Sequence, residues 1–182
     1  MKRVAFLLVT LISIAGAGSL SAQGVRFGIG GGLVMPTGDY KTADKMGFLI
    51  GADATYWLMG APVGIRLDAQ YSQTSHKNGV DGNSKIIGGL AEVVYAFGTD
   101  KAQIRPYILG GIGMFNVKVT VPSASFDTSV TKVGFGGGAG LAFKMGAGGT
   151  RFFVEGKFVT VSTGGGSNTT FLPIRAGFRF GK

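Results

Sequence analysis

The chain has 182 residues, a formal net charge of +9 and no cysteine. Its length predicts one domain, and the lack of cysteine excludes a disulfide scaffold and a cysteine-ligated metal centre. Glycine occupies 34 positions, but 45% of the residues are hydrophobic and 14 are Phe, which favours a packed structure over disorder. The cations form no basic run interleaved with aromatic residues, so we expect no nucleic-acid partner.

The N-terminus has the pattern of a secretory signal peptide. Lys2 and Arg3 precede an apolar stretch over residues 4–14, and small residues follow as far as Ser21 and Ala22. The apolar stretch is too short to span a bilayer as a helix, and no later segment is apolar for ~20 residues. We therefore expect residues 1–22 to be cleaved, after Ser21 or Ala22, and residues 23–182 to form one exported domain. A buried first strand or helix is the alternative.

Eight segments of the remaining chain each have one face without charged residues. Side chains of a strand point alternately to opposite faces, so taking every second residue exposes the pattern. The apolar faces, in chain order, cover residues 25–35, 48–58, 65–71, 87–97, 107–117, 133–143, 152–158 and 172–180. Each segment predicts one strand.

The opposite faces of these strands contain charged side chains of both signs. They are Arg26, Asp53, Arg66, Asp68, Glu92, Lys132, Lys144, Glu155, Lys157, Arg175 and Arg179. If the apolar faces contact lipid, these charges lie inside a barrel and must pair, because isolated buried ions cost several kcal/mol each. We expect an interior cluster of structural importance formed by Arg66, Asp68, Glu92, Glu155, Lys157 and Arg175. The surplus cations should lie near strand ends, as Lys132, Arg151 and Arg179 do.

Connections between the predicted strands alternate in length. Long polar connections cover residues 36–45, 73–84, 120–131 and 162–170, and short ones cover 59–62, 98–103 and 146–150. Outer-membrane barrels show this alternation, with aromatic girdles near both ends of the strands. The expected girdles are Phe27, Tyr56, Tyr95, Phe97, Tyr107, Phe143, Phe152, Phe178 and Phe180 beside the turns, and Tyr71, Phe115, Phe135 and Phe158 beside the loops.

Four stretches resemble the small eight-stranded outer-membrane β-barrels, the OmpA- or OmpX-like proteins with an outer membrane protein β-barrel domain. They are residues 105–113 (RPYILGGIG), 152–158 (FFVEGKF), 171–180 (FLPIRAGFRF) and 88–93 (GGLAEV). The resemblance covers residues 24–182 and implies an all-β, eight-stranded, antiparallel, up-and-down transmembrane barrel. It also implies the bacterial outer membrane as location and the barrel assembly machinery as partner. In the family the chain usually ends on an aromatic residue, whereas here Gly181 and Lys182 follow Phe180.

The alternation also predicts how the two faces respond to substitution. An arginine at Ala139, on the lipid face, should be costly. Introducing a small polar residue at the neighbouring inward position, Gly138, should be far less costly.

A soluble lipocalin-like barrel with its apolar face inside remains the alternative architecture.

The sequence contains little that suggests catalysis. The single histidine, His76, has Ser75 and Asp81 nearby in one loop, and we expect it to be solvated rather than part of an acyl-transfer triad. Asp39 and Asp44 could touch a hard cation, but they lack calcium-loop spacing. The glycine clusters do not complete a nucleotide-binding motif. We expect no catalytic, cofactor-binding or metal-binding residue and no cofactor.

The predicted function is that of a non-enzymatic integral outer-membrane barrel with a lumen filled by side chains. It would act in envelope structure or through binding of surfaces or an unknown extracellular ligand by its loops, with the bilayer and its headgroups as further partners. Two alternatives stay open, a small lipid-modifying enzyme (acyl transfer or hydrolysis) and a soluble periplasmic carrier.

Overall fold

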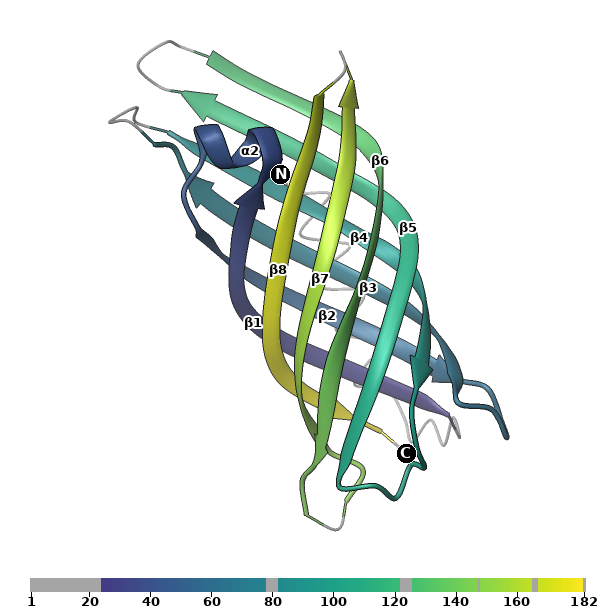
Figure 1. Ribbon diagram of the computed structural model, residues 1–182. Coiled ribbons are helices and arrows are strands. Elements are labelled where there is room, and N and C mark those ends of the chain that lie inside the picture. Colours follow the sequence, from purple (N-terminus) through teal and green to yellow (C-terminus); the bar gives the residue numbers. More distant parts are fainter. Residues whose placement is uncertain (1–23, 78–81, 122–125, 147, 165–166, 182) are drawn as a thin grey trace, which may run out of the picture.

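The computed structural model describes residues 24–77, 82–121, 126–146, 148–164 and 167–181. Its strands are β1 (Val25–Thr37), β2 (Gly47–Trp57), β3 (Val63–Ser75), β4 (Asn83–Ala96), β5 (Ile104–Val121), β6 (Phe126–Lys144), β7 (Arg151–Gly164) and β8 (Ser167–Phe180). Each strand pairs antiparallel with the next, and β8 pairs with β1, so the sheet closes into a barrel (Figure 1). The predicted eight-stranded, up-and-down barrel is confirmed.

One short helix, α2 (Gly38–Ala43), interrupts the strands. It follows β1 directly and lies against β8 and β1 at one end of the barrel (Figure 1). Within the described residues, no helix is long and apolar enough to cross a membrane.

The outer surface of the barrel is apolar on every strand. Large hydrophobic side chains are exposed there, one example from each strand in order being Phe27, Ile50, Leu67, Val93, Ile112, Phe135, Phe158 and Phe178. Inward positions on the same strands hold buried charged residues, including Asp53, Arg66, Glu92 and Glu155. The predicted phase of the alternation is therefore observed on seven strands, and six of these have buried charges. On β6, the predicted inward residues Lys132 and Lys144 are exposed and half-buried.

Strand β5 has the opposite phase to the prediction. Tyr107, Leu109 and Phe115 are buried in the lumen, whereas Ile108 and Ile112 are exposed outside. Residues 106–117 contain no charged residue on either face, so no charge marks the inner face there. Strand β5 begins at Ile104, and its second residue, Arg105, is buried on the same face as Tyr107. Two aromatic residues, Tyr107 and Phe115, are consequently not part of the outer girdles.

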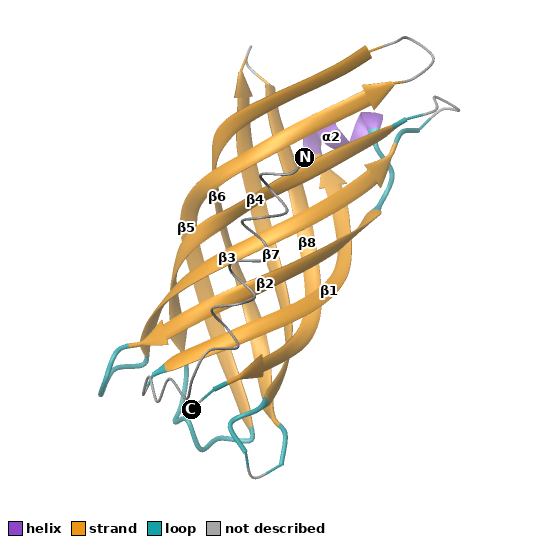
Figure 2. Cartoon of the chain, turned by 180° about the vertical axis from the view of Figure 1, so that it is seen from behind, coloured by secondary structure: helices purple, strands orange, loops and turns teal. Residues whose placement is uncertain are grey.

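The two ends of the barrel differ, as Figure 2 shows. The first, which we call the turn end, holds the start of β1, the end of β8 and the three short connections between strands. Gly60, Gly98 and Gly146 lie one in each connection with φ of +73°, +73° and +64°. Only glycine adopts this left-handed conformation without strain, which allows the tight reversals. The opposite end we call the loop end.

At the loop end the strands run further than the sequence predicted. The expected loops over 120–131 and 162–170 are mostly strand, because β5 continues to Val121, β6 starts at Phe126, β7 continues to Gly164 and β8 starts at Ser167. Threonine recurs in both segments, and it favours extended pairing although it is polar. The β5–β6 hairpin therefore projects as a paired ribbon (Figure 2).

The expectation that Gly138 tolerates a small polar residue is wrong. A Cβ atom added to Gly138 would lie 2.1 Å from the carbonyl oxygen of Gly156 and 2.8 Å from the Cα atom of Lys157. Strands β6 and β7 approach too closely there for any side chain. Alternation identifies the face of a residue but not the space around it.

Side chains fill the lumen along its length. In the half toward the loop end, an apolar cluster consists of Val34, Leu49, Ile86, Leu90, Phe115, Val117, Val159, Val161 and Phe171. Nearer the turn end, a smaller one consists of Val94, Ala96, Tyr107, Leu109 and Ala142. Buried charged residues lie between the two apolar clusters and at the turn end, and they form the candidate site.

Candidate functional site

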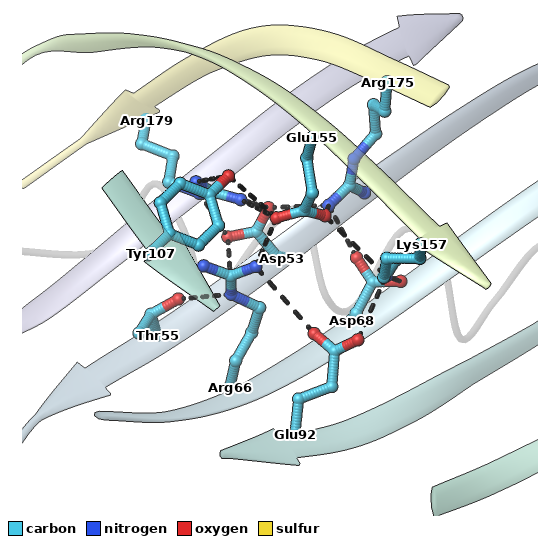
Figure 3. A network of polar contacts seen from close by, with 10 residues as sticks. All are labelled: Asp53, Thr55, Arg66, Asp68, Glu92, Tyr107, Glu155, Lys157, Arg175 and Arg179. Atoms are coloured by element: carbon cyan, nitrogen blue, oxygen red, sulfur yellow. Dashed lines mark hydrogen bonds and ion pairs between the residues drawn. The ribbon is translucent and has the colours of Figure 1, made fainter. Parts of the chain in front are cut away.

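Eight charged side chains from five strands meet inside the barrel (Figure 3). We call this group the lumen cluster, and it comprises Asp53, Arg66, Asp68, Glu92, Glu155, Lys157, Arg175 and Arg179. Every member is at most 5% exposed. The structure thus brings together all six residues proposed from the sequence, and it adds Asp53 and Arg179.

Glu155 is the main acceptor of the lumen cluster. Its carboxylate accepts hydrogen bonds from Arg66 Nη1 at 2.7 Å, Arg179 Nη2 at 3.0 Å and the hydroxyl of Tyr107 at 2.9 Å. Arg179 also donates from Nη1 to that hydroxyl at 2.9 Å and from Nε to Asp53 at 3.0 Å. The hydroxyl of Tyr107 therefore links Glu155 to Arg179. These hydrogen bonds inside the lumen stabilise the observed phase of β5, in which Tyr107 points inward.

Lys157 and Arg175 connect the remaining acids. Lys157 Nζ lies 2.9 Å from Asp68 and 3.1 Å from Glu92. Arg175 Nη2 lies 2.7 Å from Asp68 and 3.1 Å from Asp53. The contacts of Lys157 with both acids and of Arg175 with Asp53 are charge-assisted hydrogen bonds, which are among the stronger ones in proteins. The contact between Arg175 and Asp68 is an ion pair without hydrogen-bond geometry.

The lumen cluster is electrically balanced, because its four basic and four acidic members cancel. Balance matters here, since a buried charge without a partner is strongly destabilising. The geometry leaves no member as a solvent-exposed acid or base. We therefore interpret the lumen cluster as a structural element that holds five strands in register.

Two buried arginines, one of them in the lumen cluster, were placed wrongly from the sequence. Arg179 and Arg151 were expected near water at strand ends, but they are only 5% and 4% exposed. Lys132 is exposed, as expected. The strand register explains why Arg179 is buried. Gly28 of β1 pairs with Asp53 on β2 and with Arg179 on β8, so the arginine lies near the carboxylate inside the barrel. That register is invisible until β1 and β8 are known to pair.

Three further arginines lie at the turn end. Arg26, Arg105 and Arg151, which we call the arginine mouth, converge on Asp100 at 2.7, 3.0 and 3.8 Å. The guanidinium of Arg105 also stacks on Trp57, 4.8 Å from the ring centroid. Partial burial raises the pKa of the Asp100 carboxyl, but the hydrogen bond and charge of Arg26 and the charges of its two neighbours lower it more, so the pKa lies below its ordinary value.

His76, at the loop end, is not the solvated residue that the sequence suggested. Its Nδ1 lies 2.5 Å from Asp44, which comes from the connection after α2, and its side chain is 9% exposed. The other oxygen of Asp44 accepts a hydrogen bond from the Thr74 hydroxyl, which also contacts the hydroxyl of Tyr40 at 2.7 Å. Burial and the nearby carboxylate of Asp44 raise the pKa of Tyr40, against the lowering effect of its hydrogen bond to Thr74.

The predicted grouping of Ser75 and Asp81 with His76 does not describe this site. Ser75 is exposed, Asp81 lies outside the described residues, and the partner of His76 comes from a different loop. Asp44 is engaged by His76 and Thr74 rather than open to a cation, and the side chain of Asp39 is outside the described set. Across the described parts of the chain, no three His, Cys, Asp or Glu side chains form a group able to hold a metal.

Comparison with known proteins identifies similar barrels. The family model of the outer membrane protein beta-barrel domain matches residues 4–180. Neisserial surface protein A superposes with a TM-score of 0.65 at 16% identity, over 87% of this chain and 97% of that one. The attachment invasion locus protein Ail of Yersinia pestis, bound to the heparin analogue sucrose octasulfate, gives 0.57 at 19%, over 86% and 99%. The outer membrane enzyme PagL gives 0.50 at 17%, over 87% and 99%. No curated protein sequence matches the chain.

Proposed function

Since the chain belongs to the outer membrane protein beta-barrel domain family, we propose that it is a non-enzymatic barrel that binds anionic groups at the cell surface through its loop end. Members of the family lie in the bacterial outer membrane, and the apolar outer surface of the barrel suits contact with lipid. Delivery by a signal peptide over residues 1–22, which lie outside the described residues, and insertion by the barrel assembly machinery are part of this proposal.

The filled lumen is the observation that carries the proposal. The lumen cluster and the two apolar clusters occupy the interior from one end to the other. An eight-stranded barrel has an interior that side chains can fill completely. Because side chains fill this interior, we place the function at the ends of the barrel.

The loop end is rich in cations. Its segments contain six lysines, which are Lys41, Lys45, Lys77, Lys85, Lys118 and Lys132, against the aspartates Asp39, Asp44, Asp81 and Asp127. Asp44 is already engaged by His76 and Thr74. Lys85 and Lys118 are directly opposite each other across β4 and β5, on the outward face. The register places these two lysines side by side on neighbouring strands, so one anionic group can contact both.

The ligand class follows from this charge and from one structural relative. Ail, with the same fold, was crystallised with a sulfated heparin analogue. We expect a sulfated or phosphorylated surface glycan to bind here by charge, with an affinity that falls as salt rises.

Titration of the micelle-embedded protein with sucrose octasulfate tests the proposal. The double variant Lys85→Gln/Lys118→Gln should bind roughly fivefold more weakly or worse, since exposed ion pairs contribute about 0.2–1 kcal/mol each. Lys101→Gln, which removes a lysine charge at the turn end, far from the loop end, is the control and should have no effect. Absence of binding, or equal losses in the variant and the control, would contradict the proposal.

Measurement of conductance tests the sealed lumen separately. The protein reconstituted in planar bilayers should show no large, stable conductance. Such a conductance would show that the lumen cluster opens, and the role assigned to the loop end would lose its main support.

The paired His76 and Asp44 favour a second candidate, a lipid-modifying enzyme. A carboxylate that orients Nδ1 leaves Nε2 to act as a general base, and Nε2 of His76 is buried without a hydrogen-bond partner among the described residues. No hydroxyl nucleophile contacts Nε2 within that part of the chain, which favours the non-enzymatic function. Lipid deacylation measured for the wild type and for His76→Ala decides between them, because activity lost in the variant would establish the enzyme.

A further inference from the structure

The arginine mouth carries more positive charge than its surroundings neutralise. The acids of the lumen cluster are already paired with its own cations, and among the described residues only Asp100 pairs with Arg26, Arg105 and Arg151. Three guanidiniums against one carboxylate leave a formal charge of +2. The arginine side chains are at most 9% exposed, whereas that of Asp100 is 59% exposed. Buried charge of one sign in a protein is normally matched by a partner or a ligand.

Unpartnered hydrogen-bond donors gather at the same place. Arg26 Nε, Arg105 Nε and Trp57 Nε1 are all buried, and none has a hydrogen-bond partner among the described residues. Each of them is a donor and none is an acceptor. Buried polar groups are nearly always satisfied, so three orphan donors around one space indicate an acceptor-rich ligand.

A cavity adjoins these groups. It has a volume of about 240 Å³ and is lined by Arg26, Arg105, Asp100 and Trp57, with Leu58 and Met59 at its rim. This is smaller than the ~300–1,000 Å³ typical of sites for drug-sized ligands. A second cavity of about 20 Å³ leads toward the lumen cluster and is far too small for a polyatomic anion. A ligand is therefore confined to the outer cavity, at the turn end.

We propose that the arginine mouth binds a phosphate group. A phosphate has the charge to offset +2 and several oxygens to accept from the guanidiniums and the indole, and arginine is suited to such oxygens by its planar fork of donors. Asp100 already accepts hydrogen bonds from Arg26 and Arg105, so it competes with the ligand for these donors. The group is supplied either by free phosphate or by a phospholipid headgroup. The exposed Leu58 and Met59 at the rim would lie beside the acyl chains of such a lipid.

Trp57 provides the readout, because it is the single tryptophan of the chain and stacks on Arg105. Inorganic phosphate is titrated into the protein in phosphate-free maltoside micelles, and indole fluorescence is followed. Saturable quenching or enhancement is expected in the wild type. Arg105→Gln and Arg26→Gln should weaken binding roughly tenfold or more, since each removes a charge-assisted hydrogen bond. Lys101→Gln, which removes an exposed cation beside Asp100 in the same turn, is the control for non-specific loss of charge and should change the affinity far less than the arginine variants do.

Asp100→Asn keeps the test decisive if the arginine variants fail to fold. Asp100 is exposed in a turn, so the variant should fold, and removal of the competing carboxylate should tighten phosphate binding several-fold. Micelles doped with phosphatidylglycerol separate the sources. If a lipid headgroup is the ligand, doping abolishes the response to free phosphate, and if free phosphate is the ligand, doping leaves it intact. No saturable response at millimolar phosphate, or unchanged affinity in Asp100→Asn, would overturn the proposal.

Discussion

Replacing Glu155 with Gln removes one negative charge from the balanced lumen cluster while keeping the size of the side chain. Glu155 is 1% exposed and accepts hydrogen bonds from Arg66, Arg179 and Tyr107. A unit charge about 4 Å away contributes about 4 kcal/mol at an effective dielectric constant of about 20. Breaking one side of a buried ion pair typically costs about 3–5 kcal/mol. We expect the free energy of unfolding to fall by that amount.

Urea unfolding of the protein folded into lipid vesicles, followed by Trp57 fluorescence and by the mobility of unheated samples on gels, measures this change. The double variant Glu155→Gln/Arg66→Gln restores the charge balance. It should therefore be more stable than the sum of the two single variants predicts, by about 0.5–3 kcal/mol, as contacting residues usually show. A loss below about 1 kcal/mol for Glu155→Gln, together with strict additivity, would refute the view that the lumen cluster is held by charge balance.

Three other substitutions test other parts of the structure. Ala139→Arg, on the outer face, should reduce the free energy of unfolding by about 2–4 kcal/mol, whereas Ala139→Leu should not, in the same urea assay. Gly138→Ser should destabilise the barrel or block its folding, because its Cβ would lie 2.1 Å from a β7 carbonyl oxygen; a vesicle folding assay measures this. The pKa of Asp100 is lowered in the folded state, so its contribution to stability is complete above the unfolded-state value of about 4 and is lost as pH falls through the folded value. The gap in urea midpoint between wild type and Asp100→Asn should therefore be larger at pH 6 than at pH 3.

Each of these has a result that would count against the structure. Equal tolerance of arginine and leucine at Ala139 would mean that this face does not contact lipid. A Gly138→Ser barrel as stable as the wild type would show that β6 and β7 are further apart there. A gap that is constant between pH 6 and pH 3 would mean that the arginine mouth does not act on Asp100.

The sequence predicted the orientation of a strand wherever charges marked one face. Arg66 and Asp68 do so for β3, and Glu155 and Lys157 do so for β7. In β5 the marker is Arg105, the second residue of the strand, whereas the apolar face predicted for this strand begins at Tyr107. A strand that is apolar on both faces has no intrinsic phase, so its neighbours decide which residues enter the lumen.

Contacts between segments that are distant in the chain could not be predicted from the sequence, for a different reason. His76 and Asp44 are 32 residues apart and meet because β2 and β3 bring their connections together at the loop end. The local sequence identified His76 as a loop residue, but it could not show which carboxylate would form a hydrogen bond with it. The same limit applies to Arg26, Arg105 and Arg151, which become one site only when the barrel closes.

Strand number, barrel class and the inward position of most charges follow from the sequence alone, because the two-residue period of a strand is a local property that each segment expresses independently. Four other features depend on the register across the closing β1–β8 pair and on the space inside the lumen. They are the pairing of the buried charges, the phase of β5, the close approach of strands at Gly138 and the uncompensated charge of the arginine mouth. Those quantities exist only in three dimensions, where the position of each side chain is set by strands far away in the chain.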